Sequence, residues 1–152
     1  MKKVFAVICA VAILMSLSVT AFAANTTGGE ADITTSIEPT YTVTIPADVN
    51  VVFNATETAF GTIEVTASQI HPDKQIRVTL TTDGELNNTI DTTKVIPYVI
   101  KDASGAAFKT ATYLTEGDKT ELSIHITADD WNAAYAGDYT DTVTFTVSYE
   151  SK

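Results

Sequence analysis

The residues from Tyr139 to Tyr149 alternate in character without a break, and this run constrains the fold more than any other feature. Hydroxyl residues fall on one parity, and mostly apolar or aromatic residues fall on the other: Tyr139, Asp141, Val143, Phe145, Val147 and Tyr149. Period-2 alternation of β-branched and aromatic residues predicts a half-buried strand. We therefore expect Val143, Phe145 and Val147 to be buried in a core.

No further strand-like run follows this one in the sequence, so we expect another segment to cover its outer edge. An exposed apolar edge strand is an aggregation hazard. The candidate is the alternating run near 31–37, in which Ile33 and Ile37 share one face, two pleats apart. Two arrangements stay open: this leading strand closes its own domain, or it inserts into a neighbour, which is a second copy of the chain or another surface protein. Either way the interface would contain Ile33, Ile37, Val143, Phe145, Val147 and Tyr149.

The N-terminal residues have the pattern of a secretory leader. Lys2 and Lys3 precede an apolar run, and Ala21-Phe22-Ala23 supplies the small-x-small pattern of a cleavage site. The apolar run is short for a membrane span. We predict a signal peptide over 1–23, an extended N-terminal segment over 24–39 and a β-sandwich domain over 40–152, in a secreted protein of the cell surface.

Charge and cysteine usage narrow the possible partners. Removing residues 1–23 leaves 129 residues with seven basic and 19 acidic side chains, a net charge of −12, and no cysteine. This length suits one domain with a sizeable core. An acidic surface argues against nucleic acid and against anionic membranes, which attract basic patches. The lack of cysteine removes thiol chemistry and the common zinc sites.

The remaining runs also alternate, with threonine at many of the polar positions. Strand-like runs lie near 31–37, 40–45, 49–53, 62–67, 75–81, 94–101 and 121–127, and one short helical turn is expected near 128–136. Pro97 predicts an edge strand or a bulge. Short strands separated by turn signals predict an all-β, antiparallel Greek-key sandwich of about seven to nine strands. The Ala136–Tyr139 lead-in is similar to the tyrosine corner of immunoglobulin-like sandwiches.

Few residues are candidates for chemistry. His71 and His125 are the two imidazoles, and neither accompanies a nucleophile motif, so we expect no enzyme and no cofactor. Four carboxylates near the expected helical turn could hold calcium, although their spacing matches no calcium loop: Asp129, Asp130, Asp138 and Asp141. The alternative is an ordinary acidic surface turn.

Aromatic residues raise a second possible function. Five of them could line a surface that binds carbohydrate or wall polymer, although aromatic residues of sandwiches more often lie in the core: Tyr41, Tyr98, Tyr113, Trp131 and Tyr135. The two function classes are therefore a structural surface protein and a glycan-binding module. Exposure of these rings on one face would favour the second.

The C-terminal run, AGDYTDTVTFTVSYE, resembles the closing strand of spore coat U and related fimbrial-subunit domains. Phe60-Gly61-Thr62 is similar to a Phe-Gly-x step in those domains. The resemblance implies an incomplete immunoglobulin-like sandwich that an extended N-terminal segment of a neighbour completes. The chain departs from that pattern in lacking a cysteine pair. The same C-terminal run is also similar to the end of WxL cell-wall-binding domains, with Phe145 in place of a tryptophan, and Tyr41-x-Val43-x-Ile45-Pro46 is typical of small Gram-positive surface proteins.

Overall fold

The computed structural model describes residues 30–152, so the predicted signal peptide lies outside the described residues. The chain divides into two units, Met1–Glu38 and Pro39–Lys152. In the first unit, residues 30–38 belong to no helix or strand, and the strand predicted near 31–37 does not form. The Ile33 side chain is 99% exposed and that of Ile37 is 68% exposed.

The second unit is built from strands and one short helix, so the all-β prediction is confirmed. Its elements, in chain order, are β1 (Thr40–Thr44), β2 (Glu57–Gln69), β3 (Lys74–Thr81), β4 (Glu85–Asn88), β5 (Val95–Pro97), β6 (Val99–Asp102), β7 (Thr110–Tyr113), β8 (Lys119–His125), α1 (Ala128–Ala133), β9 (Tyr139–Thr140) and β10 (Thr144–Ser151). The helix lies within the predicted helical turn. The Thr127 side chain caps it by accepting a hydrogen bond from the Asp130 amide.

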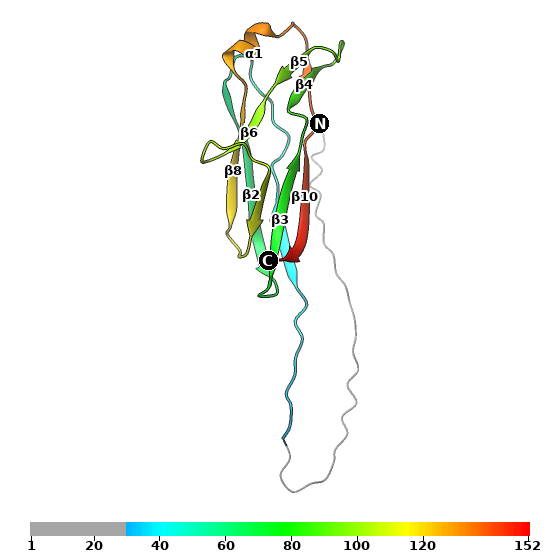
Figure 1. Ribbon diagram of the computed structural model, residues 1–152, viewed down its shortest axis with the longest axis vertical. Helices are drawn as coiled ribbons and strands as arrows, with labels where there is room; N and C mark the ends of the chain where they lie inside the picture. Colours follow the sequence, from blue (N-terminus) through cyan, green and yellow to red (C-terminus); the bar gives the residue numbers. More distant parts are fainter. Residues whose placement is uncertain (1–29) are drawn as a thin grey trace, which may run out of the picture. The chain divides into compact units, whose positions relative to one another are not determined.

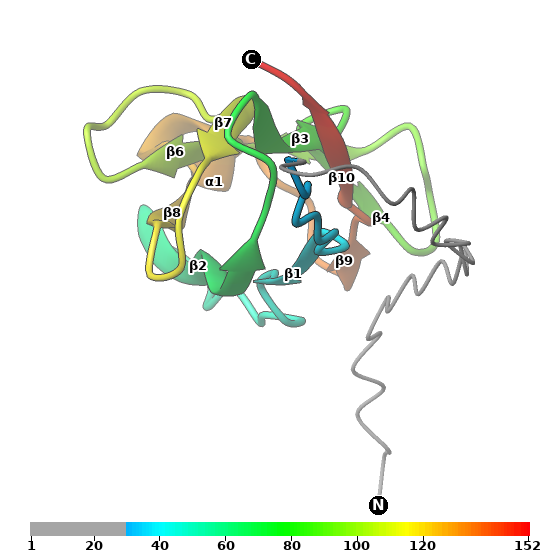
Figure 2. The ribbon, with the colours of Figure 1, turned by 90° about the horizontal axis from the view of Figure 1, so that it is seen from below.

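The strands form three antiparallel sheets. One has the order β1-β2-β8-β6, the second β10-β3-β7 and the third β5-β4-β9. Figure 1 shows β4 above β3, so the third sheet continues the second at the end of the unit that carries α1. Figure 2, seen from below, shows β2 and β8 on one side of the unit and β3 and β10 on another.

The inner faces of these sheets enclose one hydrophobic core. Its fully buried side chains come from every sheet, and in β2, β3 and β8 they lie at alternate positions of the strand. The buried hydrophobic set is Ile63, Val65, Ile76, Val78, Leu80, Ile96, Tyr98, Ile100, Phe108, Tyr113, Leu122, Ile124, Ile126 and Trp131. Ten strands form among residues 30–152, rather than seven to nine: two expected strands are each divided in two, β4 and β7 form outside the expected runs, and the runs near 31–37 and 49–53 form no strand.

The interruptions fall at identifiable residues. Tyr98 separates β5 from β6, and Pro97 ends the edge strand β5, as the sequence predicted for a proline there. The predicted final strand breaks at 141–143 into β9 and β10. The short strand predicted over 49–53 is wrong, because no strand pairs with these residues. They instead connect β1 to β2 and reverse at Asn54, which has a φ of 64°.

The predicted burial of the final strand needs correction. Val143 and Phe145 are half-buried and pack against the core, as the parity requires, but Val147 is 37% exposed. The reason is the position of β10 at the edge of its sheet, where β3 is its one neighbour among the described strands. The inward face of an edge strand is covered from one side, so its side chains keep part of their exposure.

Candidate functional site: the open edge of β10

The edge of β10 that faces away from β3 is unpaired within residues 30–152. Its ladder with β3 runs in register from the Thr144–Thr81 pair to the Ser151–Lys74 pair. Outside this ladder, none of the main-chain hydrogen bonds of the described residues involves Thr144–Ser151. Alternate N–H and C=O groups of an edge strand therefore remain available to another strand.

A hollow of about 1270 Å³ adjoins this edge. Half-buried Val143 and Phe145 line one side, and the connection from β1 to β2 supplies the other side through Ile45, Val49 and Phe53. Phe60, Leu86 and Ile96 also line it. The hollow is thus a groove, with both apolar and polar side chains in its lining, between the edge of one sheet and the segment that leaves the other sheet. We call it the β10 groove.

The segment that follows β1, which forms the far wall of the β10 groove opposite Val143 and Phe145, approaches β2 closely at Gly61. Gly61 lies in the irregular part of the β2–β8 ladder with a φ of +136°. A Cβ built at Gly61 would lie 3.1 Å from the Cβ of Pro46. Glycine therefore suits this position for two reasons, its left-handed backbone and the approach of the chain that follows β1.

Two aromatic pairs mark what β10 faces along its length, Tyr41 of β1 near one end and Phe60 of β2 near the other. The rings of Tyr41 in β1 and Tyr149 in β10 lie 5.7 Å apart, so the start of β1 meets the end of β10. Near the start of β10, the rings of Phe60 and Phe145 lie 6.0 Å apart at the base of the groove. The groove lining extends from this pair to α1 and does not include Tyr41, Val147 or Tyr149. The gap beside β10 is consequently narrow at the Tyr149 end and wide at the α1 end.

The wide end of the β10 groove carries exposed apolar side chains. Phe53 packs edge-on against Trp131, with 5.5 Å between ring centroids, and is still 70% exposed. Tyr135 is 63% exposed, and the Lys94 ammonium lies 4.9 Å from the centre of its ring. Trp131 itself is buried and donates its indole N–H to the Ala55 carbonyl over 2.9 Å.

A hydrogen-bonded cluster fixes the break between β9 and β10. The Tyr98 hydroxyl donates to Asp141 Oδ2 over 2.5 Å and lies 2.7 Å from Thr82 Oγ1. Burial raises the pKa of Tyr98, and the hydrogen bond to Asp141 raises it further. The phenol therefore stays protonated at neutral pH and can serve as the donor. Asp141 is thus committed to a structural contact.

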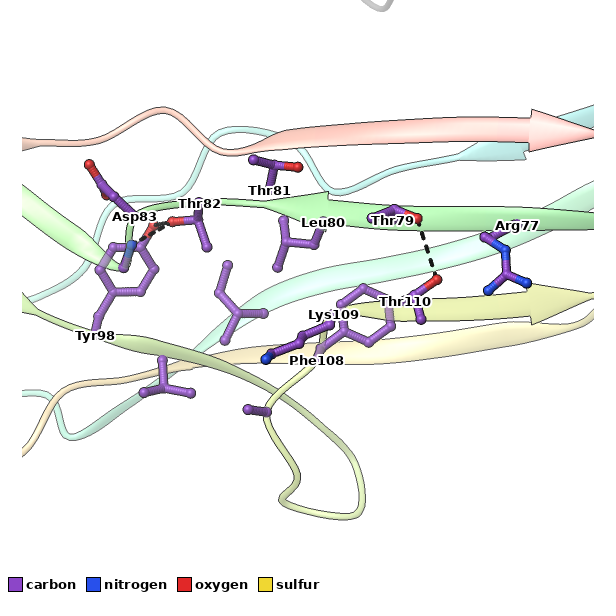
Figure 3. A pocket seen from close by; sticks show the side chains of 14 residues that line it. Arg77, Thr79, Leu80, Thr81, Thr82, Asp83, Tyr98, Phe108, Lys109 and Thr110 are labelled. Carbon is purple, nitrogen blue, oxygen red and sulfur yellow. Dashed lines mark hydrogen bonds between the residues drawn. The ribbon is translucent and has the colours of Figure 1, made fainter.

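A second hollow, of about 640 Å³, lies on the other side of β3 (Figure 3). Leu80, Tyr98 and Phe108 form its apolar base, and Thr79 and Thr110, which are hydrogen-bonded to each other, lie on its rim. The Tyr98 hydroxyl is already engaged by Thr82 and Asp141. We place the candidate site at the larger groove, because that groove adjoins an unpaired strand edge.

The other sequence candidates are dispersed. Asp129 and Asp130 lie in the first turn of α1, Asp138 is exposed, and Asp141 contacts Tyr98. No three metal-ligating side chains within residues 30–152 come close enough together to hold an ion. His71 contacts Asp73, and His125 lies 2.9 Å from Ser123 Oγ.

The five candidate glycan-binding aromatics do not share an exposed face. Tyr98, Tyr113 and Trp131 are buried, Tyr41 is half-buried, and Tyr135 is exposed. Sequence reasoning missed the far wall of the β10 groove, because the apolar residues over 49–53 were interpreted as a strand. The available signal was the set of apolar residues at every second position, Val49, Val51 and Phe53. It indicated an apolar face, but it did not indicate which segment that face lies against.

Comparisons with protein-family models and with curated proteins give no match to this chain. None of the helices in the described part of the chain is both long enough and apolar enough to cross a membrane.

Proposed function

We propose that the protein is a secreted, non-catalytic structural component of a bacterial cell surface, which assembles by adding a strand to the open edge of β10. It would serve as a fibre or pilus subunit, an adhesin or a matrix component. The observation that carries this proposal is the half-covered inward face of β10 beside an unpaired edge. In strand addition, main-chain hydrogen bonds supply affinity and alternate side chains supply specificity.

The finer fold that we propose is an incomplete immunoglobulin-like Greek-key sandwich. The order β1-β2-β8-β6 corresponds to the sheet of the first, second, fifth and fourth strands in such domains. β3 and β10 then correspond to two strands of the other sheet, in which the final strand would lie beside β10. One departure is that β7, between β6 and β8 in the chain, pairs with β3.

The added strand that we propose is the leading segment, residues 31–37. Ala31, Ile33, Thr35 and Ile37 share one parity, which suits a strand with one face against a core. The two isoleucines are exposed in the structure, so the segment has apolar side chains available to bury. Its seven residues are close in length to the eight of β10.

We propose a neighbouring copy as the acceptor, because Glu38 and Pro39 do not suit a tight reversal before β1. A two-residue hairpin needs positive φ at its first central position, or at both. Proline fixes φ near −65°, and the residue before proline favours extended backbone. A turn of more than two residues would include Ile37, which could then no longer insert as part of the strand. Self-closure would also place the inserted strand parallel to β10, because β1 and β10 run in opposite directions.

Exchange between copies allows the opposite direction, antiparallel to β10. A donor segment that enters from the wide α1 end would place Ile37 beside Val143 and Ile33 beside Val147. Ala31 would then lie beside Tyr149, where the gap is narrow and a small side chain fits. This direction continues the antiparallel pairing of β10 with β3 and of β3 with β7, and parallel pairs are slightly less stable.

The test is the size of the secreted protein on a gel. We expect the protein taken from the culture to form an SDS-resistant ladder of multiples of the subunit, which collapses to monomer on boiling. Strand-exchanged subunits bury a whole strand, so they should dissociate slowly without heat. A sharp monomer peak at all concentrations, with no ladder, would overturn the proposal.

A further inference from the structure

The leading segment carries acidic charge and no basic residue. Asp32 lies within residues 31–37, Glu30 and Glu38 flank them, and all three side chains are exposed. Asp32 and Glu38 have the parity opposite to Ile33 and Ile37, so they would remain on the outer face after strand addition. The segment would thus bring several negative charges to its acceptor without burying them.

The acceptor surface is acidic as well. Asp48, Asp138 and Asp141 line the β10 groove, and its lining contains no lysine, arginine or histidine. Basic side chains near the two ends of β10 make contacts of their own: Lys94 lies over the Tyr135 ring, Arg77 forms an ion pair with Glu150 over 2.7 Å, and Lys74 donates to Ser151 Oγ over 2.9 Å. The chain without its leader carries a net charge of −12. A donor strand therefore approaches a surface of its own sign.

We infer that this like charge gates assembly, so that copies stay apart at low ionic strength and join when salt screens the carboxylates. The inference rests on the proposed strand addition and concerns its regulation. In the antiparallel register, Glu38 lies beside Thr142, next to Asp141, and Glu30 lies beside Glu150. Juxtaposed like charges oppose association, and charge–charge effects act chiefly on its rate. The Debye length falls from about 30 Å at 0.01 M salt to about 8 Å at 0.15 M.

The experiment measures the half-time of ladder formation by the secreted protein at two salt concentrations. We expect assembly to be about fivefold or more faster at about 0.15 M than at about 0.01 M sodium chloride. The triple variant Glu30→Gln, Asp32→Asn, Glu38→Gln should assemble quickly at both concentrations, with a difference below about twofold. Glu116→Gln, an exposed change in the turn before β8, is the control and should keep the full salt dependence.

The outcomes distinguish the proposed control of assembly by like charge, which we call the charge gate, from the strand addition on which it rests. Equal rates for the unmodified protein at both concentrations would overturn the gate and leave strand addition standing. A triple variant that retains the salt dependence would also overturn it, because the charges would then act elsewhere. Absence of a ladder under every condition would instead remove the proposed function, and the gate with it.

Discussion

Replacing Ile33 with Asp should abolish the polymer ladder and leave the stability of the monomer almost unchanged. In strand exchange Ile33 is buried in a neighbour, where an unpaired carboxylate costs several kcal/mol. In the isolated subunit the side chain is 99% exposed. The free energy of unfolding of the monomer, measured by denaturant titration, should therefore change by less than about 0.5 kcal/mol.

The matched control is Thr34→Asp, which adds the same carboxylate one residue away. Thr34 has the opposite parity and would face solvent in the inserted strand, so its variant should still form the ladder. A loss of monomer stability above about 1 kcal/mol for Ile33→Asp would instead indicate that the segment closes its own domain. An effect on neither property would make residues 30–38 a tail without a role in assembly.

Replacing Trp131 with Ala should destabilise the fold by about 3–5 kcal/mol, the range for removal of a buried large aromatic side chain. Trp131 is buried at the α1 end of the β10 groove, and its indole donates to the Ala55 carbonyl. The substitution removes the packing and leaves this carbonyl without its partner. Denaturant unfolding of the monomer measures the change.

The neighbouring ring provides the comparison for this variant. Phe53 packs on Trp131 but is 70% exposed, so Phe53→Ala should cost much less than Trp131→Ala. Equal costs for the two changes would contradict the described packing of α1. A loss below about 1 kcal/mol for Trp131→Ala would show that the helix does not depend on this side chain.

Alternation predicted most of the strands because strand side chains alternate between core and solvent over much of this chain. Ile76, Val78 and Leu80 are buried at alternate positions of β3, as the pattern indicated. The same rule failed over 49–53, where the apolar residues line a groove and no strand pairs with them. Periodicity reports which face is apolar, and it does not report whether a partner strand lies alongside.

The candidate site was predictable in part for the same reason. The parity of Val143, Phe145 and Val147 indicated the correct inward face, but the partial exposure of Val147 depends on which strands flank β10. The break at 141–143 depends on the contact of Asp141 with Tyr98, 43 residues away in the chain. The neighbours of β10 and the partner of Asp141 are both set by tertiary contacts. The local residue pattern therefore could not predict the exposure of Val147 or the break at 141–143.

The most direct test of strand exchange is disulfide capture between two single-cysteine proteins. The chain without the predicted signal peptide contains no cysteine, so each secreted protein carries only the cysteine that is introduced. One protein then carries Ile37→Cys and the other Val143→Cys. Cross-strand neighbours lie about 4.5–5.5 Å apart between Cα atoms, within the range that a disulfide spans. The two proteins are mixed, allowed to assemble and oxidised mildly.

Antiparallel exchange predicts covalent heterodimers on a non-reducing gel from this mixture, and few from either protein alone. A mixture of the Ala31→Cys and Val143→Cys proteins should give few, because Ala31 would lie at the Tyr149 end. The contradicting result is a disulfide within one chain in place of a disulfide between two chains. If a single chain carrying Ala31→Cys and Val143→Cys forms its disulfide internally, and the Ile37→Cys mixture forms no heterodimer, the segment closes its own domain parallel to β10.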